Sequence, residues 1–358
     1  MMGFGMKKRL LACISILVIS PLLVFGALSA TYDGWEGHPR IGAGLVPTSL
    51  GAGLSFDWQS GTSIYGKGMV GYFERMVWQD PTTGNLLDTN PLIYDQLRFA
   101  VEGGLAQQLG SHMLSIGYRI SYELPFDSMV VGRVLESGVV TPVAGFASSP
   151  IFGPLDSVNG TLEARYRFDR YLDNRAKSDG FLLDLRGSYG INRYLSILAE
   201  AKGAKTLLAQ MEGERNLFSL VVIDRIIASY DTGTQIPLSA QEKSAFGSKI
   251  RGFSTLQYPV ALSVANQFDL RLNGPSVIHS AIFPRMTLFC DVGYGYGMMA
   301  NSNYSSKGGM LASSGISLNF TLGPYMDLGY QMAYLLVGEN LAHPGVKMVG
   351  ELVAHLRF

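Results

Sequence analysis

The stretch "FGSKIRGFSTLQYP", at residues 246–259, holds an arginine, Arg251, that is followed directly by a glycine and a phenylalanine. Two aspartates, Asp269 and Asp291, come later in the chain on separate segments. A guanidinium is planar and can donate two parallel hydrogen bonds to one carboxylate. These residues could therefore form an ion pair that ties a loop to neighbouring strands. The alternative is a solvated loop arginine with two unrelated aspartates.

Other chemistry has little support in the sequence. The five histidines are scattered, without the spacing of a zinc site: His38, His112, His279, His343 and His355. No nucleophile elbow, P-loop or dinucleotide fingerprint occurs. The glycine-rich "GYGYG" at 293–297 lies on an alternating segment, so we expect its glycines to give clearance rather than bind phosphate. We expect neither an enzyme nor a cofactor or metal site.

The composition excludes some partners and some ways of holding a fold together. The chain has 358 residues, a formal net charge of +0 and only 16% charged residues, against an average of about 25% in globular proteins. A neutral balance gives no reason to expect a nucleic-acid partner. Cys13 lies in the predicted signal peptide described next, which leaves Cys290 alone, so no intramolecular disulfide is expected.

Residues 1–30 predict a cleaved signal peptide. Three basic residues at positions 7–9 precede the apolar run "LLACISILVISPLLVFG", and the small-residue stretch "ALSA" follows. This is the order of a basic region, an apolar region and a cleavage site. We place cleavage near residue 29 or 30 and the mature domain at 31–358. An uncleaved membrane anchor is the alternative, because the run is near the lower length limit for spanning.

Strict alternation of apolar and polar residues dominates the later part of the chain. In "GISLNFTL", residues 315–322, the apolar side chains take every second position, and the others are small and polar. Residues 262–272, 285–296 and 325–332 alternate in the same way, with Phe289 on the polar face of its segment. A period of two predicts β-strands. Further strands are expected near 40–47, 51–59, 61–77, 93–107, 111–123, 158–169, 180–190 and 192–201, whereas 196–229 has helical as well as strand character.

Alternation also suits a sandwich with one wet face, but three features favour an all-β transmembrane barrel. The polar face is mostly small and uncharged, aromatic residues recur near strand ends, and the chain stops on a strand. We therefore expect an outer-membrane β-barrel of about 14–16 antiparallel strands, surrounded by outer-membrane lipids. Residues 125–157 are either a long loop or one extra hairpin.

The last strand, expected at 346–358, ends in "GELVAHLRF". Leu356 and Phe358 share one face of it. A final aromatic on an alternating strand resembles the C-terminal signal that outer-membrane barrels present to the barrel insertion machinery. The alternative is an ordinary edge strand at the end of a domain.

The order of motifs after residue 240 resembles the C-terminal barrel half of the BamA/TamA-type assembly barrels, the bacterial surface antigen superfamily. In that family a long loop folds into the lumen with a VRGF-like tip, whose arginine meets acidic residues of two strands. Arg251, Gly252 and Phe253 match the tip, and Asp269 and Asp291 match the two acids. The hairpin that follows in the family is matched by Gly315, Gly323, Pro324, Asp327 and Gly329. The resemblance is concentrated in residues 240–358.

The resemblance implies a loop that is locked inside the lumen by the residues of the tip and its two acids, namely Arg251, Gly252, Phe253, Asp269 and Asp291. It implies a function in the assembly or translocation of envelope proteins or lipids, in which a seam between the first and last strands opens. Family members normally carry periplasmic POTRA domains before the barrel. Strand-like sequence here begins about ten residues after the predicted signal, so we expect no such domains and a possible separate periplasmic partner protein in their place.

Two other functions fit the same barrel. It could be a passive, porin-like diffusion channel in the bacterial outer membrane. It could also be a structural or adhesive surface protein whose loops, 125–157 and 230–257, face outward.

Overall fold

The computed structural model describes most of the part of the chain in which strands are expected. The described residues are 49–58, 60–77, 92–125, 131–133, 140–142, 157–173, 177–191, 193–212, 215–233, 246–253, 260–275, 277, 282–298, 308–322, 326–338 and 347–356. The predicted signal peptide and the expected strand at 40–47 lie outside them. Among the described residues, no helix is long and apolar enough to cross a membrane.

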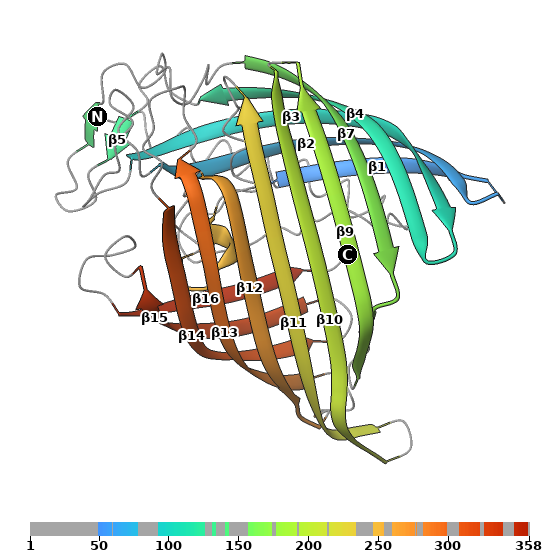
Figure 1. Cartoon of the computed structure of the whole chain (residues 1–358), viewed down its shortest axis with the longest axis vertical. Coiled ribbons are helices and arrows are strands. Elements are labelled where there is room, and N and C mark those ends of the chain that lie inside the picture. Colours follow the sequence, from blue (N-terminus) through green and yellow to red (C-terminus); the bar gives the residue numbers. More distant parts are fainter. Residues whose placement is uncertain are drawn as a thin grey trace, which may run out of the picture.

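One large antiparallel sheet of 14 strands makes up the fold (Figure 1). Its order follows the chain: β1 (Ser49–Asp57), β2 (Thr62–Val77), β3 (Leu92–Leu109), β4 (His112–Pro125), β7 (Ser157–Asp169), β9 (Ser178–Gly190), β10 (Tyr194–Glu212), β11 (Arg215–Gly233), β12 (Val260–Asn273), β13 (Ile282–Met298), β14 (Gly308–Leu322), β15 (Met326–Val337) and β16 (Met348–Leu356). The short β8 (Leu172–Asp173) pairs only with β9. The strand β5 (Val131–Arg133) pairs with β6 (Val140–Pro142), so the described residues of 125–157 form a hairpin.

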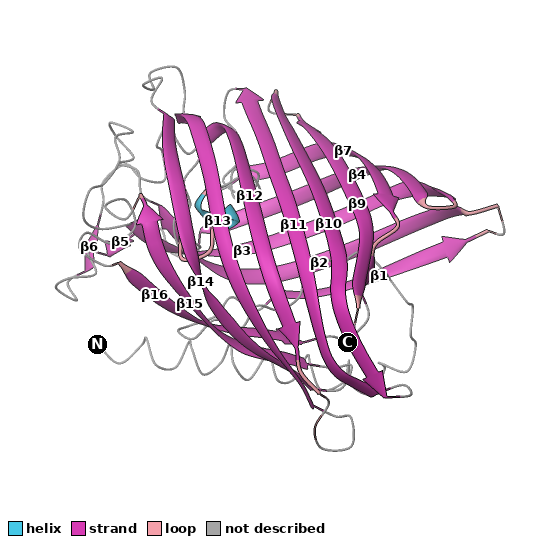
Figure 2. Ribbon diagram, turned by 60° about the horizontal axis from the view of Figure 1, so that its bottom comes forward, coloured by secondary structure: helices cyan, strands magenta, loops and turns pink. Residues whose placement is uncertain are grey.

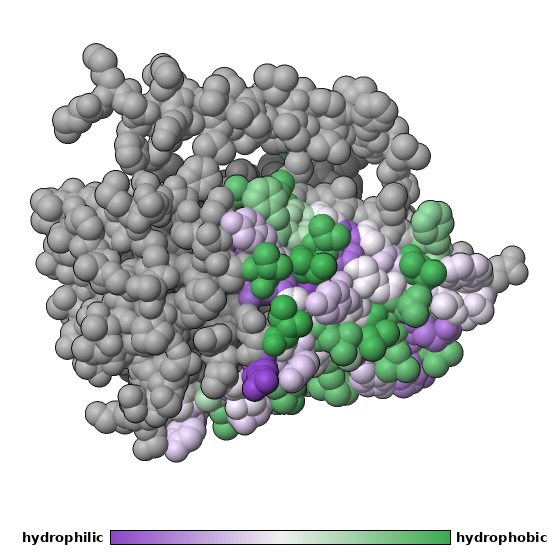
Figure 3. Space-filling view, turned by 90° about the horizontal axis from the view of Figure 1, so that it is seen from above, coloured by the Kyte–Doolittle hydropathy of each residue, from purple (hydrophilic) through white to green (hydrophobic). Residues whose placement is uncertain are grey.

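The alternation of the sequence becomes an outer face and a lumen face. On β13, Tyr294 is 53% exposed whereas Asp291, on the opposite face, is fully buried. Neighbouring strands repeat the pattern, with exposed Leu262, Leu318, Phe320, Leu328 and Tyr330 and buried Ser263, Ser317, Thr321 and Gln331. Where described residues are visible in Figure 3, hydrophobic side chains cover much of the surface. The apolar face is thus the one that faces lipid.

The sheet curves strongly on itself, so that β2–β4 and β11–β13 lie on opposite sides of one interior (Figure 2). The short helix η1 (Gly247–Lys249) lies inside this curve. The edge strands of the sheet are β1 and β16, and no pairing between them occurs among the described residues. The fold class predicted from the sequence, an all-β barrel of antiparallel strands, is confirmed.

Several strands are longer than the sequence predicts. The segment with mixed helical and strand character forms the hairpin of β10 and β11, whose strands have 19 residues each. Tertiary pairing along both edges of this hairpin overrides the helical propensity of its alanines, lysines and glutamates. The strand expected at 315–322 begins at Gly308, and the loop expected from residue 230 begins after Gly233.

The outer face makes a prediction about Leu318, which is 46% exposed. In lipid, Leu318→Arg should lower the free energy of unfolding by about 1–4 kcal/mol, because a cation on the lipid face loses part of its hydration. The measurement is urea unfolding of the barrel refolded into lipid vesicles, with Leu318→Met as the matched control. An effect of Leu318→Arg within about 0.5 kcal/mol, as at a water-exposed position, would contradict the lipid-facing assignment.

Candidate functional site

The candidate site is an inward segment between β11 and β12, residues 246–253, here called the tip segment. It begins with the single turn of η1 and continues through Ile250 into a turn at Arg251 and Gly252. All of its residues except Ser248 and Arg251 are buried. The tip segment contacts the lumen faces of β11 to β15, so five consecutive strands hold it.

Arg251 binds two aspartates of the lumen face. Its Nε donates to Asp291 Oδ2 at 2.8 Å and its Nη2 donates to Asp291 Oδ1 at 2.5 Å. The same Nη2 donates to Asp269 Oδ1 at 2.6 Å. The backbone N–H of Arg251 also donates to Asp291 Oδ2, at 2.9 Å. The guanidinium thus makes the expected two-point contact with Asp291. Asp269 accepts a further hydrogen bond from the same Nη2.

The environment of Arg251 strengthens these contacts. Its side chain is 20% exposed, and that of Asp291 is 0% exposed. Burial disfavours the charged guanidinium, but hydrogen bonds to Asp291 and the charges of Asp269 and Asp291 outweigh it and raise the pKa of Arg251. The guanidinium carbon lies 4.0 Å from the centre of the Phe289 ring, a cation–π contact. The arginine therefore stays charged, and its guanidinium is held by the two carboxylates and by the face of the Phe289 ring.

Gly252 and Phe253 complete the turn. Gly252 has φ +86°, and a Cβ added there would lie 2.8 Å from Ala333 Cβ and from Leu335 Cδ2. A side chain at this position would therefore be strained and would clash with β15. Phe253 is fully buried in an apolar cluster whose members are Phe246, Ile250, Val260, Ala265, Leu311 and Leu335. Ser313 on β14 donates from Oγ to the carbonyl of Arg251 at 2.6 Å.

Two glycines of β13 make room for the tip segment. Added Cβ atoms at Gly293 and Gly295 would lie 2.8 and 2.9 Å from atoms of the Phe246 ring. At Gly293 the added atom would also lie 3.0 Å from Ile250 Cδ1. The clearance expected of the "GYGYG" stretch is therefore confirmed, and the tip segment is what occupies the cleared space.

Lys249 is a second polar anchor that the sequence analysis missed. Its Nζ donates to Ser229 Oγ on β11 at 2.5 Å and to Ser263 Oγ on β12 at 2.6 Å. Burial lowers the pKa of Lys249 to about 8, although the negative charge of Asp231 partly offsets this. Gln267 donates to the Lys249 carbonyl at 2.8 Å. The period-two alternation places Ser263 on the lumen face. It did not place Ser229, the partner of Lys249 on β11, because that residue lies at the end of the segment with mixed helical and strand character.

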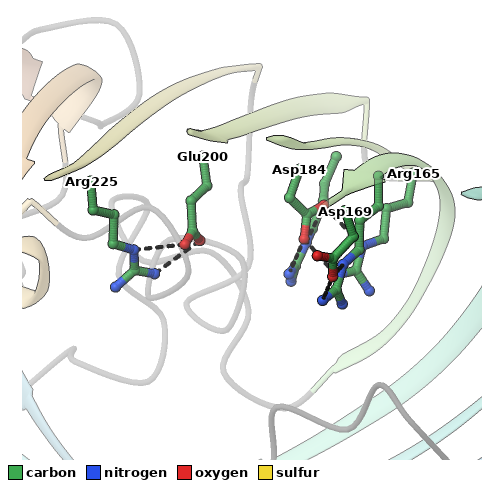
Figure 4. Close-up of polar contacts among 7 residues, drawn as sticks. Arg165, Asp169, Asp184, Glu200 and Arg225 are labelled. Carbon is green, nitrogen blue, oxygen red and sulfur yellow. Dashed lines mark hydrogen bonds and ion pairs between the residues drawn. The ribbon is translucent and has the colours of Figure 1, made fainter. Parts of the chain in front are cut away.

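Ion pairs also line other strands of the lumen face (Figure 4). Asp184 on β9 accepts from both Arg165 and Arg186, and Glu200 on β10 accepts two hydrogen bonds from Arg225 at 2.7 and 2.9 Å. Arg165 and Arg225 pair with acids of a neighbouring strand, and Arg186 pairs with Asp184 of its own strand. Charges in a confined lumen are costly unless they are paired in this way. Among the described residues, no group of three or more His, Cys, Asp or Glu side chains could hold a metal ion.

The proposed C-terminal signal is only partly described. Leu356 is the last residue of β16, and Phe358 lies outside the described residues. Its role stays a prediction.

A double-mutant cycle tests the contact between Arg251 and Asp291. Each of Arg251→Ala and Asp291→Ala should lower the free energy of unfolding by about 2–5 kcal/mol, because each leaves a buried charge without its partner. The double variant should lose at least about 1 kcal/mol less than the sum of the two, as measured by urea unfolding in vesicles. The control is Arg251→Ala combined with Lys205→Ala, because the charge of Lys205 lies on the outer face and the two effects should add. If the effects of Arg251→Ala and Asp291→Ala also simply added, the buried contact between these two residues would be contradicted.

Lys249 predicts a pH dependence. The unfolded lysine has a pKa near 10.5 and the folded one near 8, so between these values the unfolded state binds more protons and stability rises with pH. From pH 7.5 to pH 10 the gain should be about 2 kcal/mol, and it should be absent in Lys249→Met, which keeps a similar volume without the charge. Unfolding free energies at pH 7.5 and 10 provide the measurement. An equal gain in the variant would show that other groups cause it.

Comparison with known proteins supports the fold. No family model and no curated protein matches the sequence. The crystal structure of BamA from Haemophilus ducreyi lacking POTRA domains 1–3 matches with a TM-score of 0.54 and 13% identity, over 87% of this chain and 62% of that chain. CdiB from Escherichia coli matches with a TM-score of 0.55 and 12% identity, over 87% of this chain and 53% of that chain. The chain spans less than two thirds of either structure, and it has the BamA-like barrel fold that the motifs predict.

Proposed function

We propose that the protein is a bacterial outer-membrane barrel that takes part in the assembly or translocation of envelope polypeptides or lipids. Its fold is similar to those of BamA and CdiB. The observation that carries the proposal is the tip segment, because Arg251 holds it inside the lumen through Asp269 and Asp291.

In the proposed mechanism the tip segment stiffens one half of the barrel, and the seam between β1 and β16 opens. The contacts of the tip segment extend over β11 to β15, and Val349 on β16 packs against the apolar cluster to which Phe246, Ile250 and Phe253 belong. The described parts of these two edge strands, Ser49–Asp57 and Met348–Leu356, do not pair with each other. Opening this seam would therefore break fewer ladder hydrogen bonds than separating any two strands that are paired in the sheet. Substrate strands or lipid would enter the membrane there, delivered by a separate periplasmic partner protein.

The alternative function, a porin-like channel, requires an open aqueous path through the lumen. Buried contacts of Phe246, Ile250 and Phe253 with the lumen face narrow any aqueous path past β12 to β15. Planar-bilayer recordings separate the two functions. A large, steady and ion-selective conductance of the unaltered protein would favour the channel. If the protein acts in assembly, we expect little conductance from the unaltered protein and a larger conductance from Arg251→Ala, in which the tip segment is released from the lumen wall.

A complementation experiment tests the function itself. In the bacterium that encodes the chain, depletion of the protein should lower the amount of one class of outer-membrane polypeptide or lipid and should activate the envelope stress response. The unaltered gene and Lys205→Gln should restore it, whereas Arg251→Ala, expressed and inserted to the same level, should restore it at least tenfold less well. Full restoration by Arg251→Ala would contradict the proposed lock. An unchanged outer membrane after depletion would contradict the function.

A further inference from the structure

An acidic residue, Asp224 on β11, lies on the outer face of the sheet. Residues of one parity on a strand share a face, and Asp224 has the parity of Phe218 and Tyr230, whose side chains are 39% and 42% exposed. The neighbouring Arg225 has the other parity and makes the lumen ion pair described above. Asp224 is itself exposed, so its carboxylate points toward the lipid rather than into the lumen.

The two aromatic residues place Asp224 near the middle of the membrane. Phe218 lies six residues before Asp224, and Tyr230 lies six residues after it. Aromatic girdles mark both membrane interfaces of outer-membrane barrels and flank an apolar band about 25 Å tall, and six residues of a strand tilted by about 40° span roughly 15 Å of depth. The other outer positions between the two aromatic residues are apolar: Leu220, Val222, Ile226 and Ala228. The carboxylate is thus far from both interfaces.

Asp224 has a hydrogen-bond partner but no cation. Asn266 on β12 donates from Nδ2 to Asp224 Oδ1 at 2.6 Å. No other hydrogen bond and no ion pair of Asp224 occurs in the described part of the chain, and Lys205, on the same face, pairs with Asp179 at 3.3 Å. By contrast, each lumen acid labelled in Figure 4 is bound by an arginine. A charged side chain in hydrocarbon is costly, and in membrane proteins such residues usually have a function.

Small neighbouring side chains leave the carboxylate accessible from the membrane. Four small residues of the outer face lie on β10 and β11 beside it: Ala199, Ala201, Gly203 and Ala228. Gly203 lies directly opposite Asp224 in the register, and a Cβ added to Gly203 would meet nothing within 4 Å. Larger side chains, Phe181 and Leu185, stand on the next strand, β9. A second membrane-embedded backbone can therefore come close to Asp224, because small residues permit close approach in lipid.

We propose that Asp224 and Asn266, here called the outer pair, are the docking point for a membrane-embedded polypeptide that presents an arginine or lysine at the same depth. The outer pair offers such a cation two acceptors, Asp224 Oδ2 and Asn266 Oδ1, neither of which has a donor among the described residues. An arginine fork or a lysine ammonium carries only donors. Its charge would also neutralise Asp224 in the hydrocarbon, where the hydrogen bond from the neutral Asn266 amide leaves the carboxylate charged.

The chemistry of the outer pair favours a cationic polypeptide over the other occupants of a membrane. The polar groups of lipids lie at the two interfaces, outside the hydrocarbon core that surrounds Asp224. A second copy of the chain, related by a twofold axis along the membrane normal, would bring the same surface against the outer pair. Its own Asp224 would then face Asp224 of the first copy, and like charges repel strongly where the dielectric constant is low.

Association of the full chain with two synthetic peptides in phosphatidylcholine vesicles tests the outer pair. Each peptide is a transmembrane helix of leucine and alanine, about 20 residues long, with uncharged ends and either one arginine or one glutamine at its centre. Energy transfer between a dye on the barrel and a dye on the peptide measures the association. Asp224→Asn removes the charge but keeps the shape and an acceptor for Asn266, so it should fold. Leu105→Met is the matched control, because Leu105 is also exposed on the outer face but lies on β3.

We expect the unaltered chain and Leu105→Met to bind the arginine peptide at least about tenfold more tightly than the glutamine peptide, because charge-assisted hydrogen bonds are about twice as strong as neutral ones. Asp224→Asn should lose this preference. Equal binding of the two peptides by the unaltered chain, or a preference that persists in Asp224→Asn, would overturn the proposal. So would self-association of the chain that Asp224→Asn abolishes, if no peptide preference accompanies it, because the occupant would then be a second copy. The assay contains no assembly substrate, so its outcome is independent of the proposed function.

Discussion

A guanidinium inside a narrow lumen is stable only where carboxylates meet it, and this requirement organises the tip segment. Arg251 cannot leave Asp291 without leaving behind a fully buried carboxylate. Removing one partner of such a pair costs about 2–5 kcal/mol, which is a large part of the stability of most domains. The pair therefore fixes both the position of the loop and the register in which β12 and β13 present their acids.

The rest of the site follows from bringing a loop so close to the lumen face. Gly252 lies against β15, where any side chain would clash, and Gly293 and Gly295 clear space on β13 for Phe246. The aromatic and aliphatic side chains of the tip segment fill that space, so packing and the ion pair act at the same place. Lys249 extends the contact to β11 and β12 through two serines. The tip segment thus joins five strands that would otherwise interact only with their neighbours.

Period-two alternation made much of this predictable from the sequence. It assigned Asp269, Asp291 and Phe289 to the lumen face, because side-chain direction in a strand depends only on parity. It could not place Ser229 or Asp231, since the alanine, lysine and glutamate residues before them suit a helix as well as a strand. Ser313 was missed because glycine and serine at the start of β14 carry no apolar alternation.

The most direct measurement is an experimental structure of the full chain in lipid nanodiscs, obtained by electron cryomicroscopy. The account predicts a closed or nearly closed barrel whose lumen contains the tip segment, with the Arg251 guanidinium within hydrogen-bonding distance of Asp291. A barrel in which residue 251 lies in bulk water, away from positions 269 and 291, would contradict it.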